Sequence, residues 1–69
     1  MATDLMTGPR LREMRRRRGW TQRHLAAELG VDVSAVRNWE RGRRPVSAAM
    51  AKLIRFTFNT KAQEAHHGA

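Results

Sequence analysis

Residues 20–45 read WTQRHLAAELGVDVSAVRNWERGRRP, and this stretch decides the fold. Thr21 has the side chain of a helix N-cap, and the residues after it follow the apolar spacing of a helix. Gly30 tolerates a positive φ, which lets the chain turn sharply where this helix ends. Asp32 provides a second N-cap, for a helix that we expect to end at about Arg41. The stretch therefore predicts two short helices joined by a tight turn.

The second of these helices has two chemically different faces. At 100° per residue, one face is short, polar and cationic. Its members are Val33, Ser34, Arg37 and Asn38. Trp39 falls on the opposite, apolar face, so we expect it to pack in the core rather than to stack on a ligand. The polar face therefore supplies the candidates for recognition.

The flanking segments predict two more helices. Thr7-Gly8-Pro9 is a helix-start signal, and the helix that follows should end at Gly19. Ser47 is the expected cap of a last helix, whose apolar spacing continues to about Phe56. Residues 54–59 also alternate between apolar and polar side chains, so a short C-terminal strand remains an alternative.

These elements divide the chain into one domain with two tails. Residues 1–6 show no periodicity and are expected to be a flexible tail, and so are the polar residues 59–69. Residues 7–58 would form the domain. A chain of 69 residues is close to the lower limit at which a hydrophobic core holds a fold alone.

Charge is the dominant feature of the composition. The chain has 14 Lys and Arg against six Asp and Glu, a formal net charge of +8, and twelve of the basic residues are arginine. This balance indicates a polyanionic partner, most often nucleic acid. The absence of cysteine excludes disulfides and thiolate-bound metal. No apolar run approaches the roughly 20 residues of a membrane span, so we expect a cytoplasmic protein.

A set of positions between Leu11 and about Leu53 matches a known family. The small Ala26, the turn residue Gly30, the apolar positions around them and the ending Glu40-Arg41-Gly42 all fall at matching places. In these positions the chain resembles the Xre/Cro/CI (lambda-repressor-like) helix-turn-helix family. The resemblance implies an all-α, compact domain of four to five helices, with a short C-terminal strand or helix for dimerisation. It also implies a transcriptional regulator, a repressor that binds a palindromic operator in double-stranded DNA as a homodimer.

The resemblance also implies roles for single residues. Contacts to base edges are implied for the polar face, Val33, Ser34, Arg37 and Asn38. Contacts to DNA phosphates are implied for Gln22, Arg23, Arg41, Arg43 and Arg44. A semi-buried ion pair that joins the first helix to the third is implied for Arg15 and Glu40, and we expect it to be structural.

The C-terminal aromatic residues allow two interpretations. Phe56 and Phe58 could complete the domain's own core, or they could form a dimer interface. Exposure of this pair would also fit an alternative function: an antitoxin-type module that binds its own promoter and a small protein partner such as a toxin. A further alternative is non-specific compaction of nucleic acid, which the positive net charge alone would support. An enzyme is not expected, and no cofactor or metal is implied, because the chain lacks a phosphate-binding glycine loop, a Ser/His/Asp arrangement and a carboxylate pair.

Overall fold

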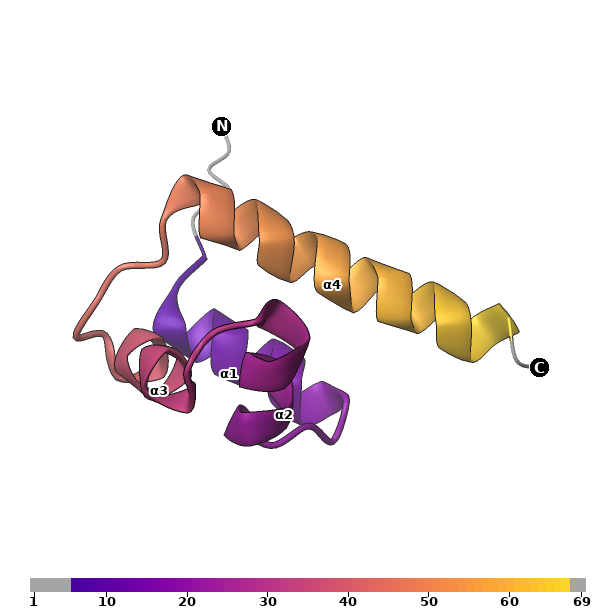
Figure 1. Ribbon diagram of the computed structural model, residues 1–69, viewed down its shortest axis with the longest axis horizontal. Helices are drawn as coiled ribbons and strands as arrows, with labels where there is room; N and C mark the ends of the chain where they lie inside the picture. Colours follow the sequence, from indigo (N-terminus) through magenta and orange to yellow (C-terminus); the bar gives the residue numbers. More distant parts are fainter. Residues whose placement is uncertain (1–5, 68–69) are drawn as a thin grey trace.

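Four α-helices and no strand make up the described part of the chain, which confirms the all-α prediction (Figure 1). The computed structural model describes residues 6–67, with side chains as far as residue 60. The helices are α1 Gly8–Arg17, α2 Gln22–Leu29, α3 Val33–Arg41 and α4 Ala48–His67. The first three begin and end close to their predicted limits.

A side-chain oxygen caps the first turn of each of these helices, as the sequence predicts. The caps accept a hydrogen bond from a backbone N–H two or three residues further on, at 2.9–3.2 Å. They are Thr7, Thr21, Asp32 and Ser47. Each cap satisfies one of the N–H groups that a helix leaves unpaired at its start.

Gly30 makes the turn between α2 and α3. Its φ is 73°, in the left-handed region that favours glycine. Its N–H donates to the carbonyls of Ala26 and Ala27, and the N–H of Val31 donates to Ala26 at 3.0 Å. These bonds satisfy the last carbonyls of α2. The predicted helix-turn-helix is therefore present.

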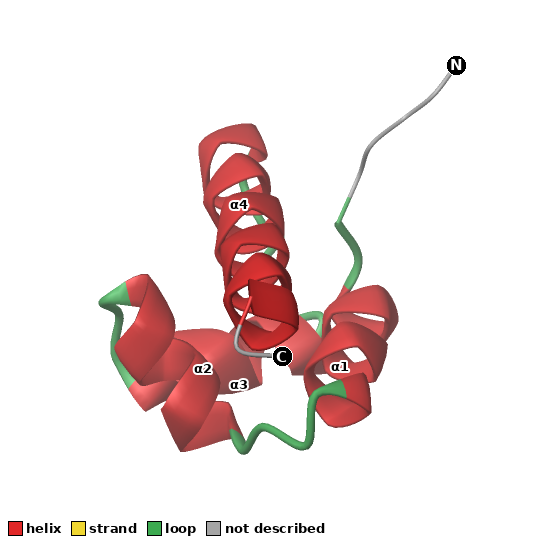
Figure 2. Ribbon diagram, turned by 90° about the vertical axis from the view of Figure 1, so that its right-hand side faces the viewer, coloured by secondary structure: helices red, strands yellow, loops and turns green. Residues whose placement is uncertain are grey.

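One hydrophobic core holds the four helices together. α3 packs against both α1 and α2, and α4 packs against α2 (Figures 1 and 2). The largest fully buried side chains come one from each helix and are Leu11, Leu25, Val36 and Ile54. Because α3 contributes its apolar face to this core, its polar face is left on the outside.

The amino-terminal limit of the core differs from the prediction. Met6, which the sequence places in a flexible tail, is 6% exposed and belongs to the core. Residue 6 lies just before α1 at the edge of the core, where the flexible apolar side chain of methionine can pack against the core. Residues 1–5, the rest of the predicted tail, lie outside the described residues.

The C-terminal region also differs from the prediction. α4 continues to His67, whereas the sequence predicts a helix to about Phe56, with a strand as an alternative, and a flexible tail from residue 59. The strand is wrong, because Ile54, Thr57 and Phe58 are buried while Phe56 is exposed, a spacing that fits a helix face and not the two-residue alternation of a strand. Nη2 of Arg18 also donates to the carbonyl of Phe58 at 2.9 Å. Contacts from distant parts of the chain therefore favour the helix.

Candidate nucleic-acid interface

The polar face of α3 is turned to solvent. Ser34 and Arg37 are exposed, and Val33 and Asn38 are half-buried. On the opposite face, Trp39 keeps only 8% of its surface exposed. The expectation that Trp39 packs in the core is therefore confirmed, and the four base-reading candidates share one accessible surface.

Asp32 restricts what Ser34 can offer to a ligand. Oδ2 of Asp32 accepts hydrogen bonds from both the hydroxyl and the backbone N–H of Ser34. The hydroxyl bond first, and the backbone bond second, hold the pKa of Asp32 below its ordinary value. Because the hydroxyl proton is donated to Asp32, Ser34 presents its lone pairs to solvent and acts as an acceptor.

The start of α2 and the polar face of α3 meet at a shallow hollow of about 290 Å³. Its lining consists of Thr21, Gln22, Arg23, Val33 and Arg37. Residues expected to contact phosphates and residues expected to read bases thus border the same depression. Its positive charge comes from one arginine on each helix. This surface can meet a nucleic-acid backbone and its base edges together.

A basic loop follows α3. The carbonyl of Asn38 accepts hydrogen bonds from the N–H of Arg43 at 2.9 Å and of Arg44 at 3.4 Å. One carbonyl therefore holds the backbone of the loop against the end of α3. The side chains of Arg41, Arg43 and Arg44 are all exposed, so three cationic groups flank the polar face of the helix.

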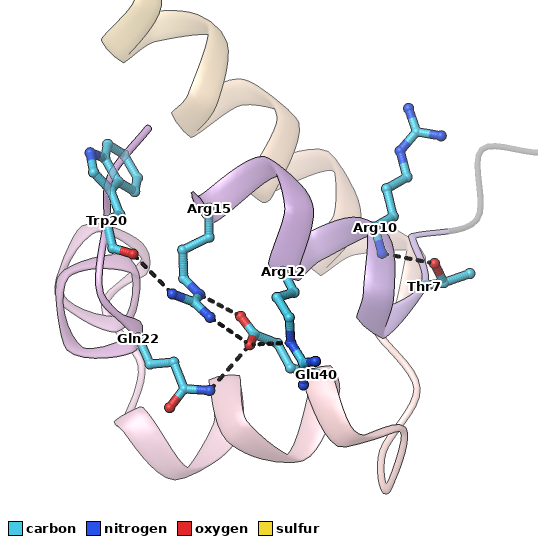
Figure 3. Close-up of polar contacts among 7 residues, drawn as sticks. All are labelled: Thr7, Arg10, Arg12, Arg15, Trp20, Gln22 and Glu40. Atoms are coloured by element: carbon cyan, nitrogen blue, oxygen red, sulfur yellow. Dashed lines mark hydrogen bonds and ion pairs between the residues drawn. The ribbon is translucent and has the colours of Figure 1, made fainter. Parts of the chain in front are cut away.

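Glu40 is the centre of a buried polar network, drawn in Figure 3. Nε of Arg15 donates to Oε2 of Glu40 at 2.7 Å, and Nη2 of Arg15 donates to Oε1 at 3.0 Å. Nη1 of Arg15 donates to the carbonyl of Trp20 at 2.9 Å. The expected pairing of Arg15 with Glu40 is therefore present in the structure. It joins α1 to α3 and to the segment that precedes α2.

Two further donors reach Glu40, and the sequence predicts neither. Nε2 of Gln22 lies 3.1 Å and Nε of Arg12 lies 3.5 Å from Oε1 of Glu40. Gln22 is expected to bind a phosphate, but one N–H of its amide is committed to this carboxylate. A phosphate contact through the second N–H stays a prediction. The sequence carries only a weak signal for these two contacts. A buried carboxylate has lone pairs for more than one donor, but the sequence does not identify the donors.

The network also sets the charge state of its members. Burial alone would raise the pKa of Glu40, but hydrogen bonds from Arg15, Gln22 and Arg12, with the charge of Arg15, outweigh it. The pKa of Glu40 therefore lies below its ordinary value of 4.5. The hydrogen bond to Glu40 raises the pKa of Arg15 against the opposing effect of burial. Both shifts favour the charged pair.

The fold separates the two C-terminal phenylalanines. Phe58 is 4% exposed and stacks on Trp20, with ring centroids 5.0 Å apart. Trp20 also stacks on His24, at 4.5 Å. Phe56 is 66% exposed, and Leu53 on the same helix is 39% exposed. Phe58 therefore completes the domain's own core, and the interpretation of Phe58 as part of a dimer interface is wrong. Phe56 remains a candidate.

The described residues contain neither a metal-binding cluster nor a membrane-spanning helix. No group of three or more His, Asp or Glu among them is placed to hold a metal ion. None of the helices in this part of the chain combines the length and the apolar character needed to cross a membrane. The surface of α3 and of the loop after it offers hydrogen-bonding groups and positive charge.

Comparison with known proteins agrees with this geometry. A family model described as helix-turn-helix matches residues 11–64, which include both helices of the motif, most of α1 and most of α4. No curated protein and no solved structure matches the chain. The family match covers more than half of the sequence. The chain therefore belongs to the Xre/Cro/CI-like helix-turn-helix family of DNA-binding regulators.

Proposed function

We propose that the protein is a repressor that binds a palindromic operator in double-stranded DNA as a homodimer. The observation that supports this most is the polar face of α3, exposed at Ser34 and Arg37 and flanked by an exposed arginine loop. The major groove of B-DNA admits a helix, whose outward side chains then reach the base edges. Occupation of an operator that overlaps a promoter would block transcription.

Each residue of the polar face suits a particular base contact. Arg37 is exposed and can donate two hydrogen bonds to O6 and N7 of a guanine. Ser34, whose proton is held by Asp32, can accept from the amino group of cytosine or adenine. Asn38 can pair with an adenine, and Val33 can pack on a thymine methyl group. The operator half-site should accordingly contain a guanine opposite Arg37.

The surrounding donors would fix the register of the protein on the duplex. Gln22 and Arg23 lie at the start of α2, and the exposed Arg41, Arg43 and Arg44 lie at the end of α3 and in the loop after it. Contacts from such residues to phosphates position a protein without reading sequence. They would supply most of the salt-dependent affinity.

The homodimer is proposed to form through the exposed face of α4. Phe56 and Leu53 are three residues apart on this helix and keep 66% and 39% of their surfaces exposed. Residues at this spacing are neighbours on a helix surface. An exposed apolar pair of this kind is stabilised when a second copy covers it. A two-fold dimer would place two copies of α3 in successive major grooves, roughly 34 Å apart.

The central experiment identifies the operator and then changes one base-reading residue. Duplex fragments that the wild-type protein retains are selected and sequenced, and binding is then titrated on the recovered site and on a shuffled site. Arg37→Ala should weaken binding to the recovered site by about 1–3 kcal/mol and relax the preference at one base pair. The reason is the loss of a bidentate contact that only guanine accepts.

Arg43→Ala is the matched control, since it also removes one exposed arginine from this surface. It should weaken the recovered and the shuffled site alike, and it should lower the salt slope of binding by about one unit. If Arg37→Ala and Arg43→Ala behaved identically on both duplexes, sequence reading by α3 would be refuted. If the recovered site did not repress a promoter placed across it in a reporter assay, the repressor role would be refuted.

The exposed face of α4 also supports a second candidate, an antitoxin-type module. Phe56 and Leu53 could be covered by a different small protein instead of a second copy. Co-expression with any small protein whose gene adjoins its own would distinguish the two. A stable complex of the two proteins that Phe56→Ala disrupts would favour the antitoxin-type module. A homodimer that forms no complex with the co-expressed protein would favour the repressor alone.

A further inference from the structure

We propose that Arg12, on α1, binds a DNA phosphate beside Gln22. The inference rests on the proposed DNA-binding function, and it adds a contact from outside the helix-turn-helix. α1 otherwise appears in this fold as a supporting helix that contributes Leu11 to the core.

The shared carboxylate oxygen places Arg12 at the edge of the candidate interface. Nε of Arg12 and Nε2 of Gln22 approach the same atom, Oε1 of Glu40, at 3.5 and 3.1 Å. The distance between these two nitrogens is therefore at most the sum of their distances to Oε1. Gln22 lines the hollow that also contains Arg37. The guanidinium of Arg12 thus lies next to Gln22, which lines this hollow. Figure 3 shows Arg12 and Gln22 approaching the same oxygen of Glu40.

The charge of the network is unbalanced, and the surplus is on Arg12. Glu40 offers one negative charge, and Arg15 already engages both of its oxygens at 2.7 and 3.0 Å. The side chains of Glu40 and Arg15 are 0% and 11% exposed, whereas that of Arg12 is 46% exposed. Two guanidinium groups facing one carboxylate leave one positive charge uncompensated. An anion that arrives from solvent can reach it only at Arg12.

The donors of Arg12 are also free to receive such an anion. Among the described residues, the Arg12 side chain makes one hydrogen bond, from Nε to Glu40, and its two Nη groups make none. A guanidinium held at one nitrogen loses less side-chain entropy when it binds again. Its planar fork suits the two oxygens of a phosphate. The geometry therefore presents an oriented phosphate-binding group.

Arg10 on the same helix provides a matched comparison. Its side chain is exposed and has no partner among the described residues, and Figure 3 shows it pointing away from Glu40. Arg10→Ala and Arg12→Ala remove the same charge from the same helix. If α1 acted only through long-range attraction, the two changes would have similar effects.

The test is a salt titration of duplex binding with the full chain. A short labelled duplex containing the selected site, and a shuffled version of it, are titrated with the wild type, Arg12→Ala, Arg12→Lys and Arg10→Ala over a series of salt concentrations. Arg12→Ala should lower the salt slope by about one unit on both duplexes, because one phosphate contact is lost. Arg10→Ala should keep the wild-type slope. Arg12→Lys, which keeps the charge, should restore it.

Thermal melts of the same variants separate a contact from a structural effect. Arg15 and Gln22 still donate to Glu40 in Arg12→Ala, so its melting temperature should stay close to that of Arg10→Ala. Equal slopes for Arg12→Ala and Arg10→Ala would overturn the phosphate contact while leaving DNA binding intact. A wild-type chain that bound no duplex would instead overturn the proposed function.

Discussion

Glu40 receives donors from α1 and from α2, while its own backbone belongs to α3. Its carboxylate therefore fixes how α3, which bears the polar face, is set against the two helices behind it. Removing one partner of a buried pair leaves the other charge uncompensated, which costs more than the loss of an exposed pair. The exposed pair of Arg17 with Glu13, at 3.0 Å on α1, is the natural contrast.

The pH dependence of stability should reveal this carboxylate. The pKa of Glu40 is lowered by folding, so its contribution to stability is complete above its ordinary value of about 4.5 and is lost as the pH falls through the lower folded value. Glu40→Gln should lower the free energy of unfolding at neutral pH by about 3–5 kcal/mol. It should also flatten the acid part of the stability curve. Thermal melts followed by circular dichroism over the acid range would measure both effects.

Glu13→Gln makes the same chemical change at the exposed pair and serves as the control. It should leave the acid dependence of the wild type nearly unchanged, since exposed helix pairs contribute only about 0.3–0.5 kcal/mol. If Glu40→Gln and Glu13→Gln gave the same curve, the network around Glu40 would not be the source of acid sensitivity.

The helices differ in how far the sequence could predict them. α2 and α3 follow from local signals, namely the caps Thr21 and Asp32 and the turn at Gly30. The pattern at residues 54–59 suits a helix or a strand equally, and the choice depends on contacts of Phe58 with segments far away in the chain. Local signals decide an element only where they do not compete with each other.

The same distinction applies to the candidate site. The outward direction of Ser34 and Arg37 follows from the helical period alone, because the opposite face is bulky and apolar. The contact of Gln22 with Glu40 forms only when α2 and α3 have packed, so no spacing rule predicts it. Orientation could therefore be predicted from the helical period, the pair of Arg15 with Glu40 is expected only from the family resemblance, and the Gln22 contact is not predicted at all.

Gly8 fixes how closely α1 and α3 approach. The sequence indicates only a helix start here, but a Cβ at this position would overlap the carbonyl oxygen of Trp39 and lie 2.8 Å from that of Glu40. Gly8→Ala should therefore push the start of α1 away from the end of α3 and lower the free energy of unfolding by about 1–3 kcal/mol. Urea unfolding followed by circular dichroism would measure the loss.

Gly30→Ala provides the comparison for this prediction. A Cβ at Gly30 meets no atom within 4 Å, so the cost is limited to the backbone strain of a left-handed alanine. That cost is about 1–2 kcal/mol and does not involve the contact between α1 and α3. If Gly8→Ala left the free energy of unfolding unchanged, the assignment of Gly8 to this contact would fail.

On the scale of the whole molecule, α4 is the longest element and lies across the others rather than within the motif (Figure 1). The molecule measures 38 × 31 × 19 Å along its principal axes. The inner face of α4 completes the core through Ile54 and Phe58, and its outer face exposes Phe56. One helix therefore completes the fold on one side and leaves an apolar side chain exposed on the other.

The two phenylalanines of α4 should separate folding from assembly. Phe58→Ala should lower the free energy of unfolding by about 3–5 kcal/mol, which is close to the whole stability expected of so small a domain. Phe56→Ala should change the stability of the single chain by about 0.5 kcal/mol or less, since the ring is exposed. Under the proposed homodimer it should weaken self-association, which sedimentation equilibrium would measure. A dimer constant unaffected by Phe56→Ala would exclude this face.

The placement of the two indoles has an optical consequence. Trp39 lies on the inner side of α3, and Trp20 is stacked between α2 and α4 on the rings of His24 and Phe58. Replacing Trp20 by Phe would leave a single fluorophore directly behind Arg37 and Asn38. Its emission would follow any movement of that helix on binding, without a label. The complementary variant, with Trp20 alone, would follow the seating of α4.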